Sequence, residues 1–294
     1  MEELAGRTAV ITGAGSGMGR AFALRFAAEG MTIVAADIQP DALAATVAEL
    51  ASAGYETAGI VTDVADPDSV QRLADAAFDR FGAVHLLCNN AGVEGYLDGP
   101  IWAATARDWE WTVGVNFWSV VNGIRAFVPR MLADGGPGHV VNTCSMTAVV
   151  SAGNMYAITK HAVLALTEVL AADLAKRDAP IGVTALCPGI IATNLFRGSR
   201  NRPAALREDD ADAQTARAAA GLPPDRDAQA GREVRERMHA TLAAGMPPAE
   251  VAAQLVNAVR AGTRYLLTDH DWDPRIQARH ESVMAGAAGP LAPA

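Results

Sequence analysis

The chain has 294 residues and half of them are hydrophobic, which is enough for one large α/β domain with a sizeable core. Its net charge of −9 and isoelectric point near 5.1 argue against a nucleic acid or an anionic membrane as partner, because both need clustered Lys and Arg. We therefore expect a small-molecule partner, no nucleic acid and no membrane.

The cysteines and the first residues indicate a cytoplasmic setting. Cys88, Cys144 and Cys187 are odd in number, far apart and in or beside apolar runs, as expected for buried free thiols of a reduced compartment. The first ten residues hold two acids and no basic region before an apolar stretch, so they do not form a signal peptide. No later segment reads as apolar for long enough to span a bilayer.

Short runs rich in Val, Ile and Leu alternate with longer segments of helical period. Nearly continuous apolar strands separated by helices are typical of a parallel sheet covered on both faces. The pattern predicts an α/β fold, a single Rossmann-like doubly wound parallel sheet with helices on both faces, in one domain over residues 1–294. The expected strands are 8–12, 32–37, 57–63, 85–89, 139–145 and 181–188, and the expected helices are 18–29, 41–53, 68–81, 108–132 and 155–177.

The regular pattern stops after Asn194. Residues 196–245 are rich in Arg, Asp and Ala with paired prolines, and they hold too few large apolar residues for a core of their own. We expect a mobile excursion with one or two amphipathic helices that acts as a lid on the substrate side. A helix over 249–260 and a strand over 264–268 should follow, and residues 285–294 should be a disordered tail.

A glycine-rich turn, TGAGSGMG at residues 12–19, directly follows the first predicted strand. A strand, such a turn and a helix N-terminus present backbone N–H groups that can bind a pyrophosphate. The second strand ends in Asp37, where a carboxylate accepts hydrogen bonds from the adenosine ribose and repels a 2′-phosphate. The alternatives are a tight structural turn and, for Asp37, a helix N-cap. We favour a dinucleotide site that binds NAD in preference to NADP.

Tyr156 and Lys160 are four residues apart on a predicted helix, so their side chains share one face. Taken alone, such a pair favours an ordinary helix surface, because Tyr and Lys meet at this spacing by chance in many helices. The whole ordered set of motifs, however, resembles that of the short-chain dehydrogenase/reductase family over residues 5 to about 195, and weakly over the last helix and strand. The set comprises TGxxxGxG at 12–19, Asp63–Val64, NNAG at 89–92, Asn116, Ser145, Tyr156-x-x-x-Lys160 and PGIIATN at 188–194.

This resemblance implies an enzyme that transfers a hydride between NAD(H) and a secondary alcohol or ketone of an apolar, medium-sized substrate. Tyr156 would be the acid/base, with Lys160 and the positive nicotinamide ring lowering its pKa and Lys160 also bonding the nicotinamide ribose. Ser145 would donate to the substrate oxygen. Asn116 would bend its helix and anchor a water in a proton relay from Lys160; a surface helix asparagine is the alternative.

The resemblance also implies a set of cofactor contacts. Asp63 would contact the adenine amino group, residues 90–92 would border the adenosine, and Thr193 with Ile191 would hold the nicotinamide carboxamide. The expected cofactor-binding residues are Gly13, Ser16, Gly17, Met18, Gly19, Asp37, Ile38, Asp63, Val64, Asn90, Ala91, Gly92, Tyr156, Lys160, Pro188, Gly189, Ile191 and Thr193.

The serine departs from the family spacing. In most relatives it lies about two residues further upstream of the tyrosine, and strict counting gives the position to Thr143. We prefer Ser145 because the run VVNTCS places it at the end of a strand, and the loop that follows can absorb a short deletion. Thr143 remains the alternative. Residues 151–154 of that loop would line the substrate side.

Other functions remain open at this point: a dinucleotide-binding regulator without turnover, an NADP-dependent ketoreductase, or an epimerase or dehydratase of the extended branch. The presence of Tyr156 and Lys160 argues against a regulator, and the glycine spacing argues against the extended branch. The family commonly associates through its two long helices, so we expect a homotetramer and, as second choice, a homodimer. Residues 268–273 are interpreted as an exposed turn, and no metal is expected.

Overall fold

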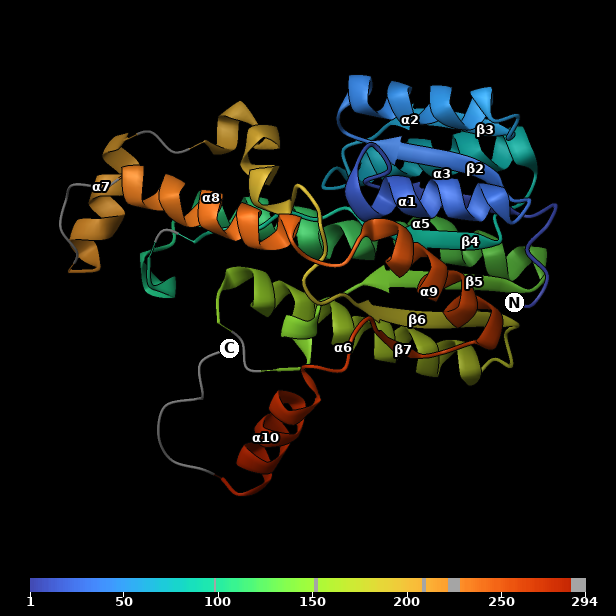
Figure 1. Ribbon diagram of the computed structural model, residues 1–294. Coiled ribbons are helices and arrows are strands. Elements are labelled where there is room, and N and C mark those ends of the chain that lie inside the picture. Colours follow the sequence, from blue (N-terminus) through green and yellow to red (C-terminus); the bar gives the residue numbers. More distant parts are fainter. Residues whose placement is uncertain (98, 151–152, 208–209, 222–227, 287–294) are drawn as a thin grey trace.

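Seven parallel strands form the centre of the molecule (Figure 1), in the order β3-β2-β1-β4-β5-β6-β7. The computed structural model describes residues 1–97, 99–150, 153–207, 210–221 and 228–286. The sheet confirms the predicted doubly wound α/β class. Its strands are β1 (Thr8–Thr12), β2 (Thr32–Asp37), β3 (Thr57–Val61), β4 (Leu86–Asn89), β5 (Gly138–Thr143), β6 (Ile181–Cys187) and β7 (Tyr265–Leu267).

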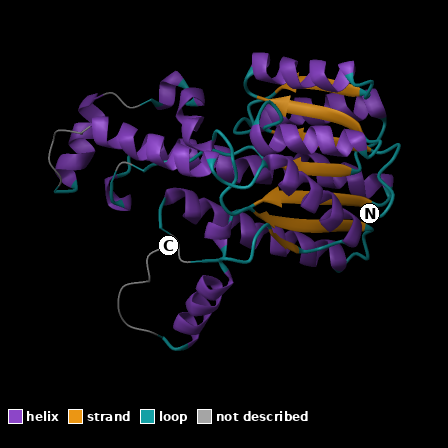
Figure 2. Ribbon diagram, viewed as in Figure 1, coloured by secondary structure: helices purple, strands orange, loops and turns teal. Residues whose placement is uncertain are grey.

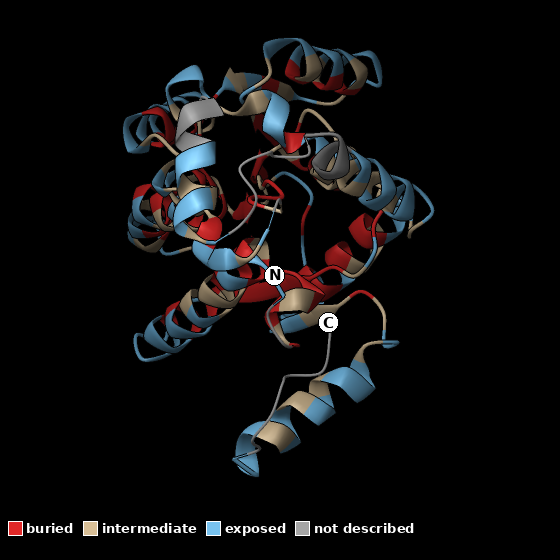
Figure 3. Cartoon of the chain, turned by 90° about the vertical axis from the view of Figure 1, so that its left-hand side faces the viewer, coloured by how far each residue is buried: buried red, intermediate tan, exposed pale blue. Residues whose placement is uncertain are grey.

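Helices cover both faces of the sheet (Figure 2). One face packs against α1 (Gly17–Ala28), α2 (Pro40–Ser52) and α9 (Pro248–Ala261), and the other against α3 (Pro67–Phe81), α5 (Ser119–Asp134) and α6 (Met155–Ala175). Every residue of β1 and β5 is therefore buried, which explains why these strands read as continuous apolar runs. Figure 3 shows the buried residues concentrated in the sheet and on the inner sides of these helices.

The helix predicted over 108–132 is divided. It comprises α4 (Ala106–Val113), a π-helical turn (Gly114–Trp118) and α5, with a capping box of Thr105 and Asp108 at its start. The π-helical turn contains Asn116, whose side chain is fully buried. Asn116 is thus not a surface asparagine, and the distortion of the helix lies where the sequence interpretation put it.

The excursion after β6 contains several short helical elements and extends away from the sheet (Figure 1). Two 3-10 helices, Leu195–Asn201 and Ala204–Leu206, precede α7 (Asp210–Ala219) and α8 (Ala228–Ala243). Within it, residues 208–209 and 222–227 lie outside the described part, as do 287–294 of the expected tail. The sequence interpretation missed α10 (Asp273–Met284), which has no buried residue of its own.

The helix α6 corrects one expectation. Its 21 residues are, by length and composition alone, apolar enough to cross a membrane. Nine of its residues, including Val163, Leu170 and Leu174, are buried in the protein, and they pack against the sheet and its neighbouring helices. Core packing accounts for this composition, so the helix is weak support for a membrane span.

Candidate active site

A pocket opens at the carboxyl edge of the sheet, where the loops after parallel strands converge. It extends from the loop after β1, past the ends of β2 and β3, to the start of α6. Fourteen of the residues predicted from the sequence line it: Gly13, Ser16, Gly17, Met18, Asp37, Ile38, Asp63, Val64, Asn90, Ala91, Gly92, Tyr156, Lys160 and Thr193.

The glycine-rich loop fits a tightly bound phosphate group. Gly13 and Gly17 have φ of +68° and +53°, a conformation that favours glycine. A Cβ on Gly19 would lie 2.1 Å from the Gly13 carbonyl oxygen, so only glycine allows this turn to close against α1. The loop thereby presents its backbone at the N-terminus of α1, as anion binding requires.

Asp37 lies at the end of β2 beside this loop. One carboxylate oxygen accepts the Gly15 N–H at 2.8 Å and the other accepts the Gln39 N–H at 2.9 Å. Asp37 does not cap α2, whose N-cap residue is Gln39. The carboxylate therefore holds a negative charge at the pocket wall.

Asn90 ties the first and fourth strands together. Its side-chain amide donates to the Thr12 carbonyl at 2.9 Å, and its backbone N–H donates to the Thr12 hydroxyl at 2.9 Å. The Thr143 hydroxyl in turn donates to the Asn90 side-chain oxygen at 3.4 Å. The NNAG segment is thus fixed by hydrogen bonds to both neighbouring strands.

Tyr156 and Lys160 line the pocket, and Ser145 lies beside Tyr156 without lining it. The Lys160 ammonium is 2% exposed, donates to the Thr143 carbonyl at 2.8 Å and lies 5.5 Å from the centre of the Tyr156 ring. The Ser145 side chain lies beside Tyr156 and acts to lower its pKa, and its hydroxyl oxygen accepts the Thr147 N–H at 3.1 Å. Thr143 does line the pocket, and its hydroxyl donates to the Asn90 side-chain oxygen.

Asn116 connects this group to the loop after β4. Its side chain accepts the Val93 N–H at 2.8 Å and donates to the Val93 carbonyl at 3.0 Å and to the Thr159 hydroxyl at 3.1 Å. The Thr159 hydroxyl donates to the Tyr156 carbonyl at 2.7 Å. Asn116 therefore positions α6 against residues 92–93 and does not line the pocket itself.

Burial dominates the ionisation of both groups in α6. It raises the pKa of Tyr156 to about 12, against the opposing effect of the Ser145 side chain, and lowers the pKa of Lys160 to about 8. A lowering of the Tyr156 pKa by Lys160 is therefore not found in the protein alone. The reason is geometric, since the ammonium bonds to a backbone carbonyl and not to the phenol.

Several predicted residues lie beside the pocket and not on its wall. Ser145 lies beside Tyr156, Asn116 bonds to Val93, and Gly19 closes the glycine turn. Pro188 accepts the Met146 N–H, Gly189 donates to Thr268, and Ile191 is 3% exposed in the core. Residues 151–152 of the expected substrate loop lie outside the described residues, and Asn154 caps α6.

The sequence interpretation missed part of the wall. Gln39, Trp111, Asn194 and Leu195 line the pocket, and so do residues of the excursion: Gly198, Arg200, Asn201, Pro203 and Leu206. The excursion was expected as a lid on the substrate side, but no pattern in it indicated that it would also meet the glycine-rich loop and the end of β2 in one pocket.

Fold and pocket together define a protein that binds a dinucleotide at the switch point of a parallel sheet. A profile of the family described as short chain dehydrogenase matches residues 7–204, and the chain belongs to this family. It is therefore an oxidoreductase whose family acts on hydroxyl groups with a nicotinamide dinucleotide.

Several known proteins are similar to it. It is 46% identical over 193 residues to the 1-deoxy-11-beta-hydroxypentalenate dehydrogenase of Streptomyces avermitilis, a match that covers 65% of this chain and 71% of that protein. It is 28% identical over 292 residues to the CLA biosynthesis dehydrogenase/reductase of Lactiplantibacillus plantarum, with 98% and 96% covered. The structure of a short-chain dehydrogenase/reductase from Burkholderia phymatum in complex with NAD matches with a TM-score of 0.89 at 38% identity, over 99% of this chain and 100% of that one.

We predict that Lys160→Met stabilises the protein without cofactor near pH 7. The folded pKa of Lys160, about 8, lies below its ordinary 10.5, so the unfolded chain binds more protons between these values. The buried ammonium thus costs stability fully below pH 8, and the cost fades as pH rises toward 10. The variant should gain on the order of 1 to 3 kcal/mol at pH 7 and less at pH 9.5, measured by urea unfolding.

Lys176→Met is the matched control, because the Lys176 side chain is 73% exposed and its removal should change little. A Lys160→Met protein that is less stable than the parent at pH 7 would show that the ammonium is well compensated by its surroundings.

Proposed function

We propose that the protein transfers a hydride between NAD(H) and a secondary alcohol or ketone of a fairly apolar, medium-sized substrate. The observation that supports this best is that Tyr156 and Lys160 line the same pocket as the glycine-rich loop, with Ser145 beside Tyr156. The names of the relatives, a hydroxypentalenate dehydrogenase and a dehydrogenase/reductase, support an alcohol or ketone as substrate.

The residues of the pocket fit the dinucleotide. The glycine turn would hold the pyrophosphate, Asp37 the adenosine ribose, Asp63 and residues 90–92 the adenine side, and Lys160 the nicotinamide ribose. Thr193 would hold the carboxamide, with Pro188, Gly189 and Ile191 shaping the turn that leads to it. When bound, the nicotinamide supplies the carbon that accepts or gives the hydride.

The protein's own residues would transfer the proton to and from the substrate oxygen. Tyr156, protonated at neutral pH because its pKa is about 12, can donate to the oxygen of a ketone and take the proton back in the reverse direction. Ser145 would donate a second hydrogen bond to the same oxygen. Lys160 would replace the lost proton through a water that Asn116 helps to anchor.

We further propose a cytoplasmic homotetramer, or else a homodimer. The three buried free cysteines fit a reduced compartment. Apolar side chains at the surface of the two long helices support self-association, with Trp118, Ile158 and Val169 exposed by 49%, 41% and 57%. Light scattering of the purified protein tests this, and a monomer at micromolar concentration would contradict it.

Tyr156→Phe should abolish turnover, because only the hydroxyl that transfers the proton is lost. NADH affinity should stay within a few-fold of the parent, since the ring still fills its place. Steady-state rates over a panel of secondary alcohols and ketones, with NADH binding by fluorescence, measure both. Activity above about one per cent of the parent would rule out Tyr156 as the acid/base.

Ser145→Ala should lower kcat on the order of a hundredfold, as loss of an oxyanion donor does elsewhere. Thr143→Ala is the matched comparison and should lower kcat only slightly. The Thr143 hydroxyl donates to Asn90, and the Thr143 carbonyl, which accepts from Lys160, is kept in the variant. The reverse ranking would transfer the role to Thr143.

Asp37→Asn should erode the preference for NAD by removing the charge that repels a 2′-phosphate while keeping the shape. We expect the ratio of kcat/KM for NAD to that for NADP to fall by at least about tenfold. An unaltered protein with the higher kcat/KM for NADP would contradict the assignment.

A further inference from the structure

The first part of the excursion, residues 195–207, forms a roof over the pocket. Leu195, Gly198, Arg200, Asn201, Pro203 and Leu206 line the pocket together with the glycine loop and the end of β2. The Gln39 side-chain amide donates to the Asn201 side-chain oxygen, which joins the roof to the turn after Asp37. The roof thus covers the dinucleotide part of the pocket and not the substrate side alone.

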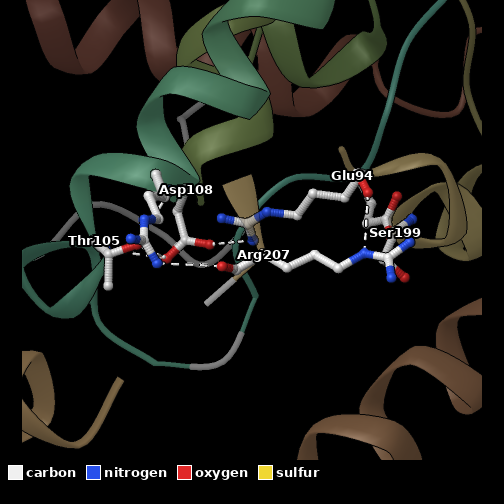
Figure 4. Close-up of polar contacts among 7 residues, drawn as sticks. Glu94, Thr105, Asp108, Ser199 and Arg207 are labelled. Atoms are coloured by element: carbon white, nitrogen blue, oxygen red, sulfur yellow. Dashed lines mark hydrogen bonds and ion pairs between the residues drawn. The ribbon is translucent and has the colours of Figure 1, made fainter. Parts of the chain in front are cut away.

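A buried ion pair fastens this roof to α4. Arg202 donates to the Asp108 carboxylate at 2.7 Å, and the two side chains are only 13% and 4% exposed. The other Asp108 oxygen accepts the Thr105 N–H at 3.0 Å and its hydroxyl at 2.9 Å, which fixes the carboxylate in place (Figure 4). The Arg202 guanidinium also lies 5.3 Å from the ring of Trp111.

Glu94 supports the roof at a second point. It is 1% exposed and its carboxylate accepts the Ser199 N–H at 3.1 Å (Figure 4). A Cβ on Gly198 would lie 2.3 Å from the other Glu94 oxygen and 3.2 Å from a Val93 methyl group, so only glycine permits this contact. Val93 is in turn held by Asn116, so the roof rests on the segment that positions α6.

We propose that the Asp108–Arg202 ion pair and the Glu94 contact form a latch that keeps the roof closed over the dinucleotide, and that opening of the latch controls dinucleotide exchange. Losing one partner of a buried ion pair leaves the other charge uncompensated, which destabilises the closed state. A closed roof obstructs entry and departure alike. Weakening the latch therefore raises both rate constants and changes the dissociation constant less.

This inference rests on dinucleotide binding, but not on which dinucleotide binds or on the substrate. It assigns Arg202 and Asp108 as positioning residues, because they act through the roof. The latch can be distinguished from a residue that only contacts the dinucleotide. Loss of a contact residue changes the dissociation rate constant, whereas loss of the latch changes the association rate constant as well.

The test uses Arg202→Met, with Arg197→Met as matched control. Arg197 lies in the 3-10 helix Leu195–Asn201 that directly precedes Arg202, is exposed and does not line the pocket. Stopped-flow fluorescence measures association and dissociation of whichever of NADH and NADPH binds more tightly. We expect both rate constants to rise by at least about tenfold in Arg202→Met and to remain near the parent values in Arg197→Met.

Three further variants distinguish loss of the latch from simple unfolding. Arg202→Lys keeps a cation and should restore much of the slow exchange, although a lysine cannot reproduce the guanidinium geometry. Adding Asp108→Asn to Arg202→Met removes the carboxylate that is left without its ion partner, and should therefore restore part of the slow exchange. Gly198→Ala should open the roof without any change of charge.

Hydrogen exchange of the protein without cofactor provides an independent readout. Amides of residues 195–207 should exchange faster in Arg202→Met than in Arg197→Met, while those of β1 and β5 should not differ. Unchanged exchange, or a rise in the dissociation rate constant alone, would overturn the latch. Failure of the parent protein to bind either dinucleotide would overturn the proposed function, and the exchange comparison would still decide on the latch.

Discussion

The rest of the site depends on the hydrogen bond from the buried Lys160 ammonium to the Thr143 carbonyl. It ties α6 to the end of β5, and because Tyr156 lies one turn earlier, it also fixes the phenol at the edge of the sheet. Burying the Lys160 charge costs stability, as its pKa shows, which burial lowers to about 8. A protein selected for stability alone would hold an apolar side chain here, and the ammonium is intelligible only as part of a site that handles charge.

The parallel sheet explains why so many polar groups can meet there. The segments after β1, β2, β3, β4, β5 and β6 all emerge at one edge, so residues far apart in sequence become neighbours without a special fold. Two asparagines fix the positions of these segments. Asn90 hydrogen-bonds to Thr12, and Asn116 hydrogen-bonds to Val93 and Thr159. The same segment after β4 holds Glu94, so the roof is supported where the catalytic helix is positioned.

The sequence predicted the parallel sheet and most of the pocket because both depend on local signals. The strands are continuous apolar runs, and Gly13, Gly17 and Asp37 belong to short motifs whose structural setting is fixed. Contacts that depend on tertiary packing were not predictable. Glu94, Asp108 and Arg202 read as ordinary surface charges in sequence, and only the fold buries them together. The raised pKa of Tyr156 was missed for the same reason, since burial is a property of the packed protein.

The most direct test of the account is the pKa of Tyr156 with and without NAD. Protein containing tyrosine labelled with carbon-13 at Cζ reports ionisation of each phenol by NMR, and the Tyr156→Phe variant assigns the resonance. The account predicts ionisation near pH 12 in the free protein and clearly below the ordinary tyrosine value of about 10 once NAD is bound beside Lys160. A Tyr156 that still ionises near pH 12 in the complex would contradict the claim that bound NAD and Lys160 together lower the pKa of this phenol.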